Sequence, residues 1–105
     1  MEKMREQVRP LVEKALQDAR AKHGRTFASW HEAYGVWSEE VMEVRQELRM
    51  LEAAMDDLMH SIHDHDDVGI QQDLSVIFRH AELAACEAIQ VAAVVAKAKN
   101  QNGGA

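Results

Sequence analysis

The feature that most constrains the fold is an unbroken apolar pattern in the middle of the chain. Apolar side chains recur there in alternating steps of three and four, at Tyr34, Trp37, Val41, Val44, Leu48, Leu51, Met55, Leu58 and Ile62. This spacing gathers them on one face of an α-helix, whereas a strand would need alternation every second residue. The pattern predicts one long helix over about residues 30–64.

Two further segments carry a helical pattern. Residues 2–23 are amphipathic but contain Pro10, so either the helix begins there, with Pro10 in its first turn, or a longer helix kinks at Pro10. Gly24 is suited to end this helix. The third segment, about residues 69–99, has an apolar stripe that becomes mostly alanine from Ala81 onward, which allows close approach of another helix.

These patterns predict an all-α fold with three main helices in a single domain, residues 1–99, followed by a disordered tail at residues 100–105. One Pro and five Gly in 105 residues agree with helix throughout. The two long stripes present more apolar surface than one chain of this size can cover. We therefore expect a four-helix-type bundle in a homodimer or tetramer.

Charge and cysteine content exclude several classes of protein. A formal net charge of -6 disfavours binding to nucleic-acid polymers, although a divalent cation can bridge acidic residues to a nucleotide phosphate. The single cysteine, Cys86, cannot form an intrachain disulfide, and we expect it to pack within its helix. No apolar run is long enough to cross a membrane, and the charged first residues do not form a signal peptide, so a cytoplasmic location is expected.

Short polar motifs precede the two long helices. Ser29 followed by Glu32 is a capping box, so Glu32 is assigned to capping. Residues 60–67 contain three His and three Asp, which we interpret as a solvated helix end and turn rather than a metal site. Asp66 or Asp67 is suited to cap the next helix.

Carboxylates lie on the flanks of the apolar stripes. Glu40 and Glu43 occupy the flank of one long helix, and Glu87 and Gln90 occupy the corresponding flank of the other. If these helices pack antiparallel, the two pairs can face each other. Oxygen ligands from two helices suit Mg²⁺, which also keeps waters and binds substrate phosphates. The alternative is that these are surface acids paired with nearby Arg residues.

With their neighbours, these residues resemble the MazG-like all-α nucleoside triphosphate pyrophosphohydrolases over roughly residues 27–98. That family has EExxE on one helix and ExxD on a later one. Glu39, Glu40 and Glu43 match the first motif, and Glu87 matches the acidic start of the second. The words HEAY and QVAA are similar to those of a phage- and mobile-element-associated subgroup.

The resemblance implies an oligomeric enzyme that releases pyrophosphate from (deoxy)nucleoside triphosphates. Its metal would be Mg²⁺, with Mn²⁺ as the alternative, held by Glu40, Glu43, Glu87 and Gln90. Glu39 is the candidate for orienting the attacking water or for an outer-shell role at the metal. Gln90 stands where the family has Asp, and so keeps an oxygen ligand but removes a charge. The other interpretation is therefore a non-catalytic helical dimer that binds a nucleotide or a protein partner.

Three more residues are candidates for binding substrate. Trp30 could stack on a nucleobase, as aromatic residues do in this family, or could only pack. His31 could contact base or phosphate, or could be exposed or cap the helix. Lys97 could reach a phosphate, but a solvated terminal lysine is the preferred interpretation. Trp37 falls on the apolar stripe and is expected to pack.

Overall fold

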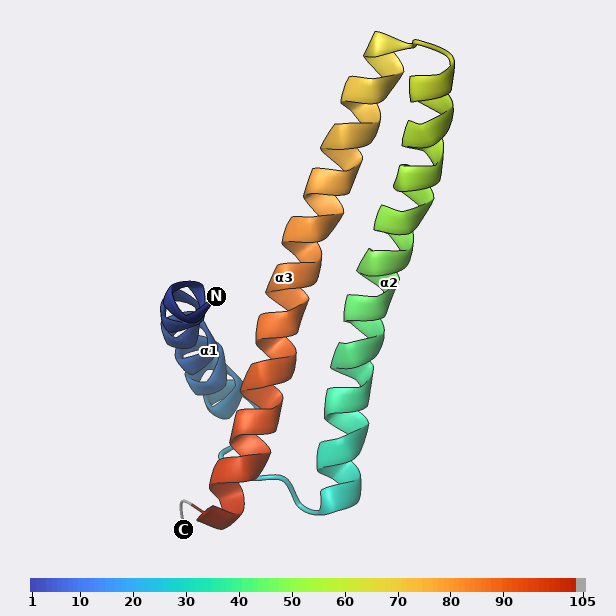
Figure 1. Cartoon of the computed structure of the whole chain (residues 1–105). Helices are drawn as coiled ribbons and strands as arrows, with labels where there is room; N and C mark the ends of the chain where they lie inside the picture. Colours follow the sequence, from blue (N-terminus) through green and yellow to red (C-terminus); the bar gives the residue numbers. More distant parts are fainter. Residues whose placement is uncertain (104–105) are drawn as a thin grey trace. The chain divides into compact units, whose positions relative to one another are not determined.

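The computed structural model describes residues 1–103, and their side chains as far as residue 100. It contains α1 (Glu2–His23), α2 (Trp30–His63) and α3 (Asp67–Gly103), and no strand within residues 1–103 (Figure 1). The all-α class and the three predicted helices are confirmed. Of the predicted tail at 100–105, α3 includes the residues as far as Gly103, and residues 104–105 lie outside those described.

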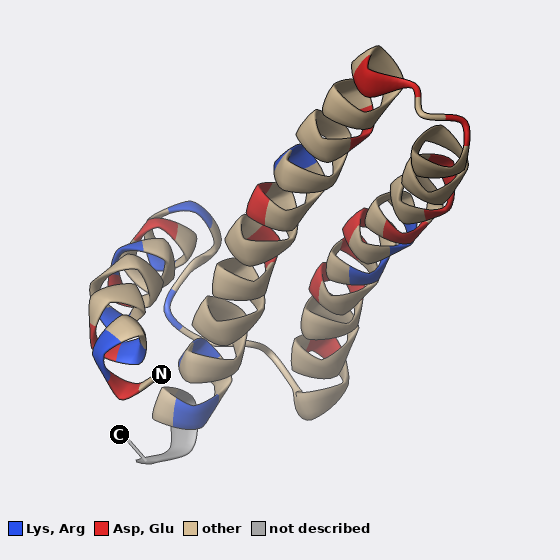
Figure 2. Ribbon diagram, turned by 45° about the horizontal axis from the view of Figure 1, so that its top comes forward, with Lys and Arg blue, Asp and Glu red and all other residues tan. Residues whose placement is uncertain are grey.

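The first helix, α1, is continuous through Pro10, so the prediction that it begins at that proline is wrong and the longer helix is present. It ends before Gly24, which has a φ of 88° and donates its N–H to the carbonyl of Arg20 at 2.9 Å. Residues that have a side chain rarely adopt this backbone conformation, which explains why glycine occupies position 24. This helix carries six of the chain's twelve Lys and Arg residues (Figure 2).

The predicted capping of α2 by Ser29 and Glu32 is confirmed, with the Glu32 carboxylate reaching the N–H of Ala28 rather than that of Ser29. The Glu32 N–H donates to Ser29 Oγ at 3.1 Å. The Glu32 carboxylate in turn accepts the N–H of Ala28 at 3.2 Å. Two N–H groups that have no partner within the helix are thereby satisfied, and the start of α2 is fixed.

The turn between α2 and α3 is held by side chains. Asp66 Oδ1 accepts the Gly69 N–H at 3.0 Å, so of the two predicted capping residues it is Asp66 that caps α3. His65 adopts a left-handed conformation with a φ of 55°. Ser61 Oγ donates to Asp73 Oδ2 at 2.7 Å, which ties the end of α2 to the start of α3. A Cβ at position 69 would collide with the Asp66 carboxylate, so glycine here leaves room for that carboxylate to cap α3.

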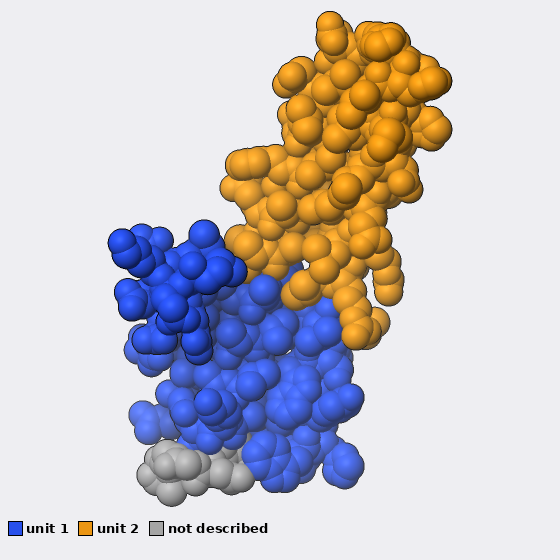
Figure 3. Space-filling view, in the orientation of Figure 1, with its two compact units in different colours: residues 1–41, 87–105 blue, residues 42–86 orange. Residues whose placement is uncertain are grey.

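The chain divides into two compact units (Figure 3). The first unit contains residues 1–41 together with α3 from Glu87 onward, and the second contains residues 42–86. In the second unit the segments of α2 and α3 run antiparallel, because Glu47 contacts His80 whereas the later Ser61 contacts the earlier Asp73. That a single domain covers residues 1–99 stays a prediction.

The first unit contains most of the buried apolar residues. One cluster consists of Phe27, Ala33, Val94 and Ala98, with Val36 and Trp37 packed against it. The expected packing role of Trp37 is thereby confirmed. A second cluster, in which α1 meets α3, consists of Ala15, Leu16 and Ala93. Small side chains on α3 let both α1 and the start of α2 approach it closely.

The second unit has a thinner core. Ala54 and Ala84 are its buried hydrophobic residues among those described. Larger side chains such as Leu51, Leu58 and Ile77 are only half-buried. Two helices alone cannot enclose a large side chain, because each helix meets the other along one line only.

Burial along α2 differs from the predicted stripe. Its most buried residues are Ala33 and Ala54, with 1% and 5% of their surface exposed, and both lie on the flank that also carries the acids. Several stripe residues are exposed instead, among them Tyr34, Met55 and Ile62. The reason is that α3 packs against the flank side of α2, which leaves half of the stripe without a neighbouring element in the described chain.

Candidate functional site

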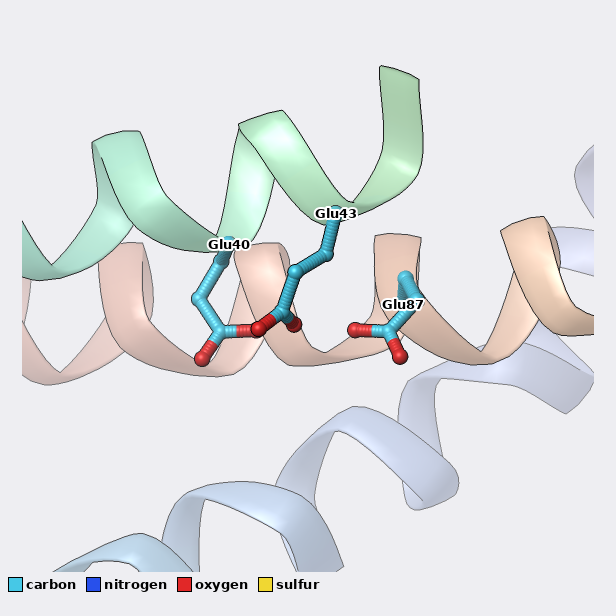
Figure 4. Close-up of side chains that lie close together, drawn as sticks. All are labelled: Glu40, Glu43 and Glu87. Carbon is cyan, nitrogen blue, oxygen red and sulfur yellow. The ribbon is translucent and has the colours of Figure 1, made fainter. Parts of the chain in front are cut away.

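Three carboxylates converge from two helices. Glu40 and Glu43 project from successive turns of α2, and Glu87 projects from α3 (Figure 4). One carboxylate oxygen from each of the three lies within 4.8 Å of the others. Glu40 and Glu87 are half-buried, whereas Glu43 is exposed.

The sequence explains this convergence. Residues three apart on a helix lie on the same face, which aligns Glu40 with Glu43. The antiparallel packing then brings Glu87 opposite Glu40, as predicted for the two flanks. Within the first unit, which contains Glu40 and Glu87, Ala33 of α2 and Val94 of α3 are buried in one cluster, so α2 and α3 are packed together there.

The spacing of these oxygens fits a hard divalent cation. Mg²⁺ binds oxygen at about 2.0–2.1 Å, so two ligands on opposite sides of one ion are about 4.2 Å apart. A mutual separation within 4.8 Å therefore needs only small side-chain rotations to enclose an ion. Without a cation three like charges repel one another, and a divalent ion relieves that repulsion.

A pocket of about 570 Å³ lies in the first unit and shares Glu40 with the carboxylate group. Its volume falls within the range of small-molecule sites, about 300–1,000 Å³. All three helices contribute to its wall, which is lined by Ala15, Asp18, Ala19, Ala21, Lys22, His23, Val36, Glu40, Gln90 and Val94. The pocket thus combines small apolar side chains with charged and amide groups.

Gln90 faces this pocket together with Glu40 and is exposed. Its amide can offer one carbonyl oxygen and two N–H donors. The position predicted as a neutral metal ligand therefore lies at the edge of a pocket that is large enough for a small molecule.

Other predicted residues lie outside this pocket. Trp30 is exposed over 56% of its surface, and His31 beside it is also exposed. Neither residue lines the pocket around Glu40. Glu39 is exposed and is not one of the three convergent carboxylates. The roles proposed for these residues stay predictions.

Lys97 is buried, with 3% of its surface exposed, so the expectation of a solvated terminal lysine is wrong. Its Nζ lies 4.2 Å from the centre of the Phe27 ring, where the π-face attracts a cation. Ten residues of helix, about 15 Å, separate it from Glu87. The charge of Lys97 therefore stabilises packing against Phe27. The positive charge that lines the pocket belongs to a different residue.

Sequence reasoning missed the contribution of α1 to the pocket, notably Asp18, Lys22 and His23. The available signal was the concentration of basic residues in the last turn of α1. Which neighbour that turn meets is decided by packing and is not encoded in its periodicity. The expectation that Cys86 is packed is also wrong, because its side chain is exposed.

Comparisons with protein families, with curated proteins and with solved structures find no match to this chain. None of the described helices has an apolar stretch of the kind that crosses a membrane. The function of this chain is therefore inferred from the residues of the site itself.

Proposed function

We propose that this chain is a Mg²⁺-dependent nucleoside triphosphate pyrophosphohydrolase of the MazG-like type, which removes unwanted (deoxy)nucleotides. The observation that carries the proposal is that Glu40 belongs both to the group of three carboxylates and to the wall of the 570 Å³ pocket. A cation held by Glu40, Glu43 and Glu87 would thus lie beside a space for the rest of a nucleotide.

In the proposed reaction, water attacks the α-phosphorus of the nucleotide. The bond between that phosphorus and the bridging oxygen breaks, which yields a nucleoside monophosphate and pyrophosphate. A bound divalent ion would neutralise charge on the phosphates. Glu40, Glu43 and Glu87 would hold the ion, and Glu39 remains our candidate for orienting the water and accepting its proton.

The proposal includes assembly into a homodimer or tetramer in the cytoplasm. The exposed apolar side chains of the second unit support it, among them Met42, Met59 and Phe78, each exposed over about 65% of its surface. Apolar surface of this kind is commonly covered by a partner. Sedimentation equilibrium at micromolar concentration should show a mass above that of one chain, and a stable folded monomer would contradict the assembly.

The activity is tested by screening nucleoside triphosphates with Mg²⁺ and measuring released pyrophosphate. Glu40→Gln and Glu87→Gln should each reduce the rate at least a hundredfold, because each removes a charged ligand. Glu52→Gln is the matched control, since Glu52 is an exposed acid of α2 outside the carboxylate group. Equal rates in the control and both site variants would contradict the proposal.

A second function is favoured by one observation, namely that an uncharged Gln90 lines the pocket where the resembled family has Asp. The chain would then be a non-catalytic helical dimer that binds a nucleotide or a protein partner. Release of pyrophosphate separates the two functions, and Gln90→Asp measures what a charged ligand at this position adds. If the chain is an enzyme, Gln90→Asp should bind Mg²⁺ more tightly than wild type does in calorimetric titration. Wild type itself should already release pyrophosphate.

A further inference from the structure

A nucleotide in the pocket would bring several negative charges next to Glu40, and these need cationic partners on the protein. The residue expected to provide one, Lys97, has its ammonium group over the Phe27 ring and is buried. Among the residues that line the pocket, Lys22 is the one Lys or Arg. It comes from the last turn of α1, and its side chain is exposed and so can move toward a ligand.

We propose that Lys22 of α1 is the phosphate-binding cation of the pocket, facing Glu40 and Gln90 across the ligand. This inference rests on the proposed function for the identity of the ligand, a polyphosphate with its divalent ion. The lysine ammonium offers three N–H donors and a compact charge, which suit phosphate oxygens. A cation on α1 and a divalent ion at Glu40 would contact different parts of the polyphosphate.

The arrangement gives α1 a role that packing alone does not require. Ala15 and Leu16 anchor the helix on Ala93 of α3. Lys22 follows Ala15 by two helical turns on a similar face, so the same contact that buries Ala15 directs Lys22 to the pocket. Binding of a polyphosphate would in turn stabilise α1 against α3.

Lys22 also has a plausible structural role, because cations in the last turn of a helix interact favourably with its carbonyl end. A structural role predicts lower thermal stability on substitution, with no preference for phosphate. A phosphate-binding role predicts loss of affinity that depends on the phosphates of the ligand. The two are therefore separated by comparing a triphosphate with the corresponding nucleoside.

The experiment is calorimetric titration of the full chain with Mg²⁺ and a deoxynucleoside triphosphate whose α,β-bridge is an unhydrolysable imido group. Lys22→Met should weaken binding at least tenfold, and Lys22→Arg should restore it to within a few-fold. Lys14→Met is the matched control, since Lys14 is an exposed lysine of α1 outside the pocket. Affinity for inorganic tripolyphosphate should also fall in Lys22→Met and be largely restored in Lys22→Arg. Affinity for the deoxynucleoside should not change in any of these variants.

The possible results of this titration distinguish a failure of the role of Lys22 from a failure of the proposed function. If wild type binds the Mg²⁺–nucleotide and Lys22→Met binds as tightly as Lys14→Met, Lys22 is not the phosphate-binding residue, and the proposed function is unaffected. Equal losses for the nucleoside and the triphosphate would show a structural role and overturn the inference. If wild type binds no nucleotide with Mg²⁺ present, both the inference and the proposed function are wrong.

Discussion

Both units of this chain contain segments of α2 and α3, but the two units are stabilised differently. In the first unit, α1 adds a third element to α2 and α3, and this unit contains seven of the nine hydrophobic residues that are buried within residues 1–100. In the second unit, Ala54 and Ala84 are the buried hydrophobic residues. The second unit also contains ten Asp and Glu residues against three Lys and Arg.

This difference shows what a third helix contributes. A third helix can cover the groove between two others and so enclose a large side chain such as Leu16, which has 1% of its surface exposed. Two helices alone leave apolar surface in water, and specific polar contacts then define how they pair. The Glu47–His80 and Ser61–Asp73 hydrogen bonds do so in the second unit.

The largest expected effect is in the first unit. Leu16→Ala should lower the free energy of unfolding by about 2–5 kcal/mol, because it leaves a cavity in a site closed on all sides. Phe78→Ala, in the second unit, removes a larger side chain that is exposed over 65% of its surface. In an isolated chain it should cost about 0.5 kcal/mol or less. Urea denaturation followed by circular dichroism measures both.

Similar losses of unfolding free energy for Leu16→Ala and Phe78→Ala would mean that the two units are equally well packed in solution. If Phe78→Ala costs as much as Leu16→Ala and the cost depends on protein concentration, Phe78 is covered by another chain in solution. The second unit would then have a core that is completed only on assembly.

The next effect concerns the turn of the second unit. Gly69→Ala should lower the free energy of unfolding by about 2 kcal/mol, because the new Cβ displaces the Asp66 carboxylate that caps α3. Gly35→Ala is the matched control, since Gly35 is inside α2 and a Cβ there meets nothing within 4 Å. It should raise stability by about 0.5–1 kcal/mol. Thermal denaturation showing the same sign for both variants would contradict the close packing at Gly69.

The smallest effect concerns the hydrogen bond between the Glu47 carboxylate and His80 Nδ1, at 2.6 Å. Both side chains are partly shielded, with 24% and 16% of their surface exposed. A double-mutant cycle with Glu47→Ala and His80→Ala should give a coupling energy of about 1 kcal/mol. A coupling energy near zero would mean that this bond contributes only to the pairing geometry of the hairpin and not to its stability.

Local signals in the sequence were sufficient for the three helices and for three of their ends, although α3 continues past residue 99, where the sequence predicted a tail. Gly24 ends α1, Ser29 and Glu32 cap α2, and Asp66 caps α3, because each depends on groups within a few residues. The convergence of Glu40 with Glu87 also followed from periodicity once the helices were taken as antiparallel.

The remaining features depend on which helix meets which face. Periodicity identified an apolar stripe on α2 but could not show that α3 packs against its flank at Ala33 and Ala54. The burial of Lys97 results from Phe27, a residue of the connector, folding over its ammonium group. The position of Lys22 in the pocket results from the docking of α1, which no local pattern specifies.

The exposed apolar surface of α2 in the second unit is rich in methionine, with Met42, Met50, Met55 and Met59 all exposed over half or more of their surface. Methionine has an unbranched, flexible side chain with a polarizable sulfur, so it adapts its shape to whatever packs on it. A surface of this composition tolerates partners that differ in contour. It is also sensitive to oxidants, because sulfoxide formation would make these four exposed side chains polar.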